Sequence, residues 1–153
     1  MRPFRFDPNE IKYISSEFHQ KIRKSRLNPG DVAVVGTGIP VSACVIPESL
    51  LETNYSDLVV IRCGEKLDPN FVSYYVNSVT PSHVRNQAVG AIQKHFNVGS
   101  AKEFPFPSLD RSDQERVAHL LVKVDTNIEL NNRINKKLEG LAKLLYDYWF
   151  RAV

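Results

Sequence analysis

Four basic side chains gather near the start of the chain and could bind an anionic polymer. Lys21, Arg23, Lys24 and Arg26 fall within six residues, with no acidic residue among them. Lysine and arginine neutralise phosphate groups, and such clusters are typical of nucleic-acid contacts. A solvated helix face explains the same cluster equally well, and the mild net charge of +3 favours neither interpretation.

Residue patterns that would support catalysis are missing from the sequence. The four histidines have no ligand-like spacing, and no phosphate-binding Gly-Lys-Ser/Thr loop occurs. Gly36-Thr37-Gly38 lacks the third glycine of a dinucleotide-binding fingerprint. Asp68-Pro69 and the two residues after it come nearest to the tetrad of amino-methyltransferases, but a helix start explains them fully. We therefore expect no catalytic residue, no metal ligand and no cofactor, while an enzyme of an unrecognised class remains a rival hypothesis.

The two cysteines and the apolar content indicate the compartment. Cys44 and Cys63 lie in apolar, strand-like stretches, which favours buried reduced thiols over a disulfide. The N-terminus lacks the apolar segment of a signal peptide, and no apolar run approaches the length of a membrane span. Hydrophobic residues make up 42% and charged residues 24% of the 153 residues, which is typical of a globular protein. We expect a cytoplasmic protein without membrane contact.

The elements that must position these side chains can be predicted from turn and periodicity signals. A short helix is expected from about Ser16 to Lys24, and then a turn at 28–31, where Pro29 presets φ and Gly30 can take a positive φ. Short apolar runs predict strands at 32–35, 41–46 and 57–62. We expect an exposed connection or irregular strand at 90–99 and an edge strand or extended linker at 104–107.

A second helix is expected to begin at Asp68-Pro69. Aspartate is a good N-cap, and proline at the first helical position loses no hydrogen bond. The apolar face of this helix would consist of Phe71, Val72, Tyr75 and Val76.

A long helix that starts at a cap on Ser112 and runs to about residue 150 is the clearest element of the sequence. Ser112 to Glu115 form a capping box, in which the serine bonds the N3 amide and the glutamate returns the bond. No proline interrupts the stretch, and its one glycine costs only about 1 kcal/mol relative to alanine. At 1.5 Å per residue the helix would be about 57 Å long, more than a small domain needs to cover its core. We therefore expect it to pair with another helix as a coiled coil.

Two asparagines interrupt the apolar seam of this helix. Asn131 and Asn135 share a face with Val124, Ile128 and Leu138. Buried asparagines reduce the stability of a coiled coil but can fix its register and orientation. The alternative, that the apolar stripe drifts around the helix and leaves both asparagines in solvent, remains open. The expected helix-pairing residues are Val117, Leu121, Val124, Ile128, Asn131, Asn135, Leu138, Leu145 and Trp149.

Six stretches, in order over about residues 11–150, match the motifs of one known protein family. Leu27 to Val32 matches the family's L-x-P-G-D-V entry to a central strand, and Leu67 to Ser78 is similar to its L-x-P-x-F-L-x-Y-x-L-N-S helix. The others are the strand-turn-strand pattern of 38–47 and 55–62, the G-x-x-Q-x-x-φ-N stretch at 90–98, the proline-rich, glutamine-containing helix start at 104–117 and the helix end at 144–150. In these six stretches the chain resembles the specificity subunits of type I restriction-modification systems.

The resemblance implies a fold, a domain organisation and a set of partners. The fold would be an α+β or mixed α/β target recognition domain at residues 1–107, lacking its N-terminal part, followed by the conserved long helix at 108–153. Such a subunit is not an enzyme: it reads half of a bipartite double-stranded DNA target and recruits methyltransferase (modification) subunits and a motor-nuclease (restriction) subunit. It would pair as a homodimer or with a second specificity half.

Chemistry rather than the resemblance supplies the candidate DNA-contacting residues. Basic side chains neutralise phosphates, and polar side chains on loops read base edges. The candidates are Lys21, Arg23, Lys24, Arg26, Thr37, Arg85, Asn86, Gln87 and Lys94, each of which could equally be ordinary surface. A truncated assembly or regulatory fragment, which pairs through its helix without specific DNA binding, remains the alternative function.

Overall fold

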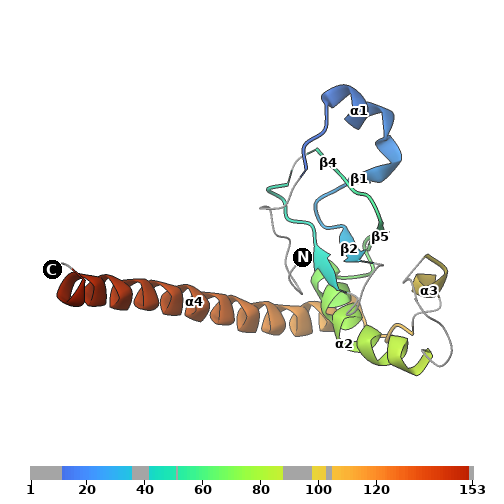
Figure 1. Ribbon diagram of the computed structural model, residues 1–153. Helices are drawn as coiled ribbons and strands as arrows, with labels where there is room; N and C mark the ends of the chain where they lie inside the picture. The colour runs from blue at the N-terminus through green and yellow to red at the C-terminus, as the bar shows by residue number, and fades with distance from the viewer. Residues whose placement is uncertain (1–11, 36–41, 51, 88–97, 103–104, 152–153) are drawn as a thin grey trace. The chain divides into compact units, whose positions relative to one another are not determined.

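The computed structural model describes residues 12–35, 42–50, 52–87, 98–102 and 105–151 (Figure 1). The helices are α1 (Ser16–Lys21), α2 (Pro69–Gln87), α3 (Val98–Lys102) and α4 (Arg111–Phe150), with one 3-10 turn, η2 (Arg23–Ser25). The strands are β1 (Arg26–Leu27), β2 (Val32–Val35), β3 (Ala43–Val45), β4 (Thr53–Asn54) and β5 (Leu58–Ile61). Small antiparallel sheets and a long C-terminal helix give the α+β class that the sequence predicts.

A three-stranded antiparallel sheet in the order β3-β2-β5 forms the centre of the core. Val32 and Val34 of β2 face one side, where they pack with Val72 and Val76 of α2. Ala33 faces the other side and packs in a second cluster with Leu27 and Ile46. Because successive side chains of a strand alternate between faces, β2 is covered on both sides, as its continuous apolar run predicts.

Helix α2 begins where the sequence predicts. The backbone N–H of Phe71 donates to Oδ1 of Asp68 at 2.8 Å, so Asp68 is the N-cap and Pro69 the first helical residue. Phe71, Val72 and Val76 are buried, and the helix packs on β3 and β2.

The prediction of a capping box at Ser112 is wrong. Asp110 caps α4 instead: its Oδ1 accepts the backbone N–H of Asp113 at 2.8 Å, and Ser112 lies inside the first turn. Glu115 does not turn back to the cap, because its carboxylate accepts a hydrogen bond from Nε of Arg111 at 2.7 Å. Aspartate caps a helix as well as serine does, so the helix begins two residues earlier than a cap at Ser112 implies.

Other boundaries differ by a few residues from the predicted ones. The first helix ends at Lys21 and continues as η2, and the two-residue strands β1 and β4 have no counterpart among the predicted elements. Within the stretch expected to be a connection, Val98 and Gly99 begin helix α3, while 90–97 lie outside the described residues. Residues 105–110 form neither helix nor strand, as the prolines predict.

The chain divides after Ala118 into two compact units. The first contains the sheets, α1 to α3 and the first two turns of α4, in which Gln114 and Ala118 are buried. The second, from His119, is the remainder of α4. The contacts therefore place the division about ten residues after the sequence-predicted boundary at 107. Among the described helices, none has the length and apolar character to cross a membrane.

Candidate functional site

The basic segment, residues 21–26, runs from the end of α1 through η2 into β1 (Figure 1). Lys21, Arg23 and Lys24 are exposed, and Arg26 is half-buried. Nζ of Lys21 lies 2.8 Å from a carboxylate oxygen of Glu17, one turn earlier, a contact that exposed groups stabilise little. In the described part of the chain, no acidic side chain forms an ion pair with Arg23 or Lys24. These two cations are the strongest candidates for phosphate contacts.

Arg62 is a basic residue at this site that sequence reasoning missed. Its Nη2 donates to the backbone carbonyl of Arg26 at 3.3 Å, and its Nε lies 3.7 Å from Oδ1 of Asp31. The Arg26 side chain has a buried Nε with no hydrogen-bond partner among the described residues. The pairing of β2 with β5 places Arg62 beside Asp31, and the hydrogen bond from Arg62 to Arg26 spans 36 positions of the sequence.

Asn54 of β4 forms hydrogen bonds with residues inside and next to the basic segment. Its Nδ2 donates to the carbonyl of Ile22 at 3.1 Å and to Oγ of Ser25 at 2.9 Å. Its Oδ1 accepts a hydrogen bond from Nδ1 of His19. In the β1–β4 pair Asn54 stands opposite Arg26, so the strand register sets the amide beside the turn. No sequence signal pointed to this contact, because the partners are 29 to 35 residues apart.

The remaining DNA-contact candidates are not brought to the basic segment by any described contact. Thr37 and Lys94 lie outside the described residues. Arg85, Asn86 and Gln87 are the last three residues of α2, and their side chains are outside the described part of the chain.

Several residues of the family-like stretches act at structural joints. In the stretch 27–32, Gly30 adopts a φ of +83°, as the turn prediction requires. Oδ2 of the buried Asp31 accepts the N–H of Asn28 at 2.8 Å and closes this turn. In the stretch 104–117, Phe106 packs edge-on against Tyr75, whose hydroxyl donates to the carbonyl of Pro105 at 2.5 Å. The proline-rich segment is thereby fixed to α2.

Gln114 joins the start of α4 to the start of α2. It is only 1% exposed, its Oε1 accepts the N–H of Asp68 at 2.9 Å, and its Nε2 donates to the carbonyls of Leu109 and Lys66 at 2.9 and 3.3 Å. Arg111 reinforces the joint by donating to the carbonyl of Leu67 and lying 3.6 Å from Asp68. The glutamine of the family-like helix start therefore has a structural role.

Asn77 of α2 bonds the edge strand β3. Its Oδ1 accepts the N–H of Ala43, and its Nδ2 donates to the carbonyl of Ala43, both at 2.8 Å. Ser73 adds a bond from its hydroxyl to the same carbonyl at 3.2 Å. Backbone groups at the edge of the sheet that would otherwise need another strand are satisfied by an amide side chain.

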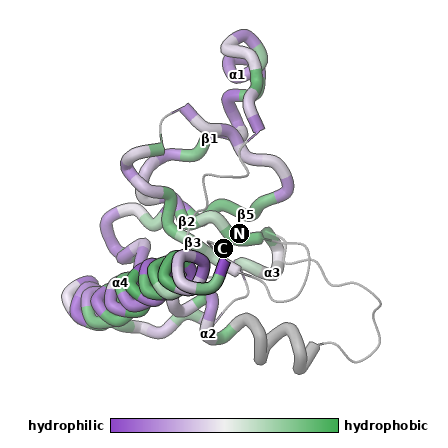
Figure 2. Tube along the Cα trace, turned by 60° about the vertical axis from the view of Figure 1, so that its left-hand side comes forward, coloured by the Kyte–Doolittle hydropathy of each residue, from purple (hydrophilic) through white to green (hydrophobic). Residues whose placement is uncertain are grey.

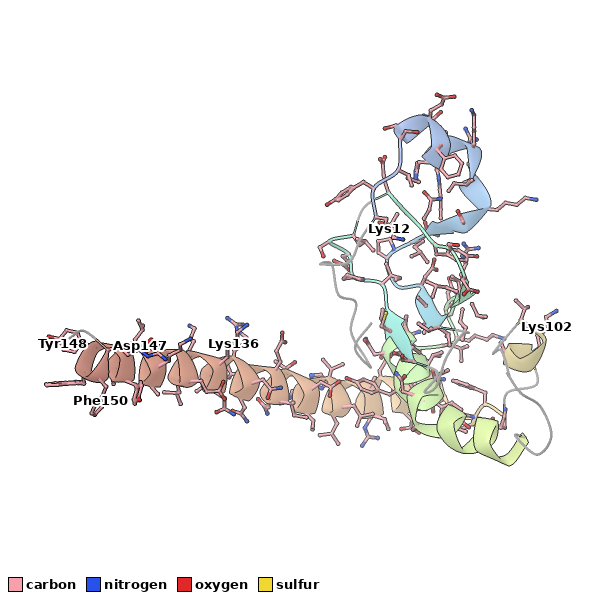
Figure 3. All side chains as sticks on the ribbon, viewed as in Figure 1. Lys12, Lys102, Lys136, Asp147, Tyr148 and Phe150 are labelled. Carbon is pink, nitrogen blue, oxygen red and sulfur yellow. The ribbon has the colours of Figure 1, made fainter. Side chains whose placement is uncertain are left out.

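The expected pairing face of α4 is exposed in the single chain. Leu121 is half-buried, and the other apolar members of the face are 42–70% exposed: Val117, Val124, Ile128, Leu138, Leu145 and Trp149. Asn131 and Asn135 are also exposed. Apolar and polar stretches alternate along α4 (Figure 2), and its side chains project on all sides (Figure 3).

The expected pairing residues form a seam along α4 whose positions follow alternating steps of three and four residues. Their residue types are nearly symmetric about the middle of this seam. Around its midpoint at Arg133, Leu121 corresponds to Leu145, Ile128 to Leu138, and Asn131 to Asn135. Residues 111–130 carry four acidic and three basic side chains, whereas 131–150 carry two acidic and four basic ones. An antiparallel copy of α4 would therefore bring matching seam residues and opposite charge excesses together.

Burial keeps the two cysteine thiols in their protonated form. Both cysteines are present as thiols, and burial raises the pKa of Cys44 and Cys63 to about 11; at Cys63 the Asp68 carboxylate adds to the effect. Within the described residues, no group of three or more His, Cys, Asp or Glu side chains lies close enough to hold a metal ion. The chain matches no known protein-family model.

Proposed function

We propose that this chain is the DNA sequence-recognition component of a type I restriction-modification complex. It reads half of a bipartite target with its first unit and recruits the methyltransferase and restriction subunits through its long helix. The chain itself carries out no catalysis. Two copies, or one copy and a second specificity half, pair through α4 as a coiled coil and place two recognition units in one complex.

The observation that carries the DNA-binding part of the proposal is the basic segment. Arg23 and Lys24 are exposed on a short turn that is held in place by hydrogen bonds, and neither has an acidic partner in the described part of the chain. Fixed cations on an accessible turn suit the phosphates of a duplex. The resemblance over six ordered stretches supplies the system to which this DNA binding would belong.

The pairing part of the proposal is supported by α4. A helix of 40 residues with an exposed apolar seam leaves its apolar surface in water unless a partner covers it. This same observation favours the second candidate function, an assembly or regulatory fragment that pairs through α4 without reading DNA.

DNA binding across a salt series separates the two candidates. The purified chain is titrated with a 30-base-pair duplex between about 50 and 200 mM salt, with and without the methyltransferase subunit. The logarithm of the binding constant should fall with a slope of about 0.9 for each phosphate neutralised. Absence of binding in both states would refute the proposal and leave the assembly role.

A pair of charge variants tests the basic segment directly. Replacing Arg23 and Lys24 by alanine should lower the salt slope by up to about 1.8, because two phosphate contacts are lost. The matched control replaces Lys136 and Lys137 of α4, which removes the same two charges from an exposed stretch of the second unit. An equal loss of slope in both double variants would show a general charge effect and contradict the assignment.

A further inference from the structure

The hydrogen bonds of Asn54 fix the shape of the basic segment. The amide bonds the carbonyl of Ile22, the hydroxyl of Ser25 and the ring of His19, and these three residues belong to successive parts of the α1–η2 turn. Ser25 in turn donates from Oγ to the carbonyl of Ile22 at 2.9 Å, and its own carbonyl accepts the N–H of Tyr55 at 2.8 Å. One side chain of β4 thus organises the whole turn that carries Arg23 and Lys24.

The chain on both sides of β4 adopts unusual backbone angles. Glu52 has a φ of +47° and Asp57 a φ of +59°, both in the left-handed region that non-glycine residues rarely occupy. Such residues persist where the surrounding structure determines them, and they concentrate at functional positions. The two left-handed residues bracket the strand that carries Asn54 and pairs with β1.

We infer that Asn54 is a positioning residue for DNA binding: it holds the basic segment in its phosphate-binding shape without touching DNA itself. The inference rests on the proposed function. If only a fraction of the molecules has the turn in its binding-competent shape, the apparent affinity for DNA equals the intrinsic affinity multiplied by that fraction. Asn54 keeps that fraction high.

Replacing Asn54 by alanine therefore has a distinctive expected effect. DNA binding should weaken on the order of tenfold, while the salt slope stays at the wild-type value, because the same phosphates are contacted once the turn has been ordered. The Arg23 and Lys24 double variant should instead lower the slope. The control is Asn77→Ala, which removes another asparagine that bonds backbone groups from a distance. It should lower the unfolding midpoint and leave DNA affinity unchanged.

Limited trypsin digestion reports the shape of the segment without DNA. Trypsin cuts after arginine and lysine, so its rate at Arg23 and Lys24, followed by mass spectrometry, measures how often the turn opens. Asn54→Ala should raise this rate about tenfold, and Asn77→Ala should change it less than twofold. Ser25→Ala, which removes one of the bonds of Asn54, should give a smaller rise.

The outcomes decide between the inference and the function on which it rests. If the wild type binds DNA and Asn54→Ala binds it with the same affinity, the inference is overturned and the proposed function is left intact. Cleavage at Arg23 and Lys24 no faster than in Asn77→Ala would also overturn the inference. A reduced salt slope would overturn it too, because it would mean that cation–phosphate contacts are lost in the bound complex rather than that the turn is less often in the competent shape. No wild-type DNA binding would refute the proposed function and this role of Asn54 with it.

Discussion

At the scale of single residues, the contacts that hold the first unit together are made by polar side chains with distant partners. Gln114 reaches Asp68 across 46 positions of the sequence, and Asn77 reaches Ala43 across 34. A buried amide with all its hydrogen bonds made is costly to remove, because its partners are then left buried without one.

Replacement of Gln114 by alanine tests the joint between α2 and α4. We expect the free energy of unfolding to fall by about 2–4 kcal/mol, since the N–H of Asp68 and the carbonyls of Leu109 and Lys66 lose their partner. Urea unfolding followed by circular dichroism measures this loss. Arg116→Ala serves as the control, because the Arg116 side chain is 83% exposed and its loss should stay within about 0.5 kcal/mol. Similar decreases in unfolding free energy for both variants would show that the hydrogen bonds of Gln114 do not stabilise the contact between α2 and α4.

The Asp110 cap predicts a pH dependence. Hydrogen bonds from the backbone of Asp113 and from Ser112 hold the pKa of Asp110 below its ordinary value. A lowered folded-state pKa gives stability that is fully present above the unfolded-state pKa and is lost as the pH falls through the folded-state pKa. Asparagine caps equally well but does not titrate.

The difference in unfolding free energy between wild type and Asp110→Asn should therefore be constant above about pH 5. As the pH falls below about 4, the wild type should lose stability relative to Asp110→Asn, because the Asp110 carboxylate becomes protonated. Thermal unfolding over a pH series measures the difference. A difference independent of pH would show that the carboxylate contributes nothing as an anion.

At the scale of elements, the edge strand β3 depends on a helix rather than on a further strand. Asn77→Ala should destabilise the first unit by about 1–3 kcal/mol, because both backbone groups of Ala43 lose a partner. Ser78→Ala is the neighbouring control, since its exposed hydroxyl bonds only within α2. Hydrogen exchange of the Ala43 amide, faster in Asn77→Ala and unchanged in Ser78→Ala, would identify the cause.

The elements that could be predicted from the sequence are those with local signals. The apolar run at 32–35, the turn at Gly30 and the Asp68 cap with Pro69 all follow from residues within a few positions of one another, and all are present. The two-residue strands β1 and β4 have no periodicity of their own, so their pairing emerges only in the folded chain. The α4 cap was misassigned because Asp110 and Ser112 are both good caps within three positions.

The candidate site could be predicted only as a set of charges. The sequence identified the basic segment, but Arg62 and Asn54 reach it through strand pairing, which residue types alone do not reveal. Glu17, the acidic partner of Lys21, lies one helical turn away and outside the window that made the cluster look purely basic. The pairing face of α4 remains a prediction.

At the scale of the whole molecule, the pairing of α4 can be tested by its oligomeric state. The wild type should be a dimer in light scattering. Leu138→Asp should be a monomer, because removing a carboxylate from water at the seam costs more free energy than the pairing gains. Lys136→Asp, two positions away and off the seam, changes the charge by more but should remain a dimer. A monomeric wild type would refute helix pairing between copies.

The orientation of the pair is a separate prediction. In an antiparallel pair centred on Arg133, a chain with Leu121→Cys should form a disulfide with a chain that carries Leu145→Cys when the two are mixed and oxidised. Chains that carry the same single cysteine should not crosslink with one another. The reverse result, measured on non-reducing gels, would indicate a parallel pair.

The two natural thiols also have a practical consequence for these measurements. With a pKa of about 11, Cys44 and Cys63 hold roughly a hundredfold less thiolate near neutral pH than an ordinary cysteine, and only the thiolate reacts with alkylating reagents. A cysteine introduced at an exposed position of α4 off the seam, such as 136, would therefore take up a fluorophore or spin label first. The molecule can be labelled at one chosen site with its own cysteines left in place.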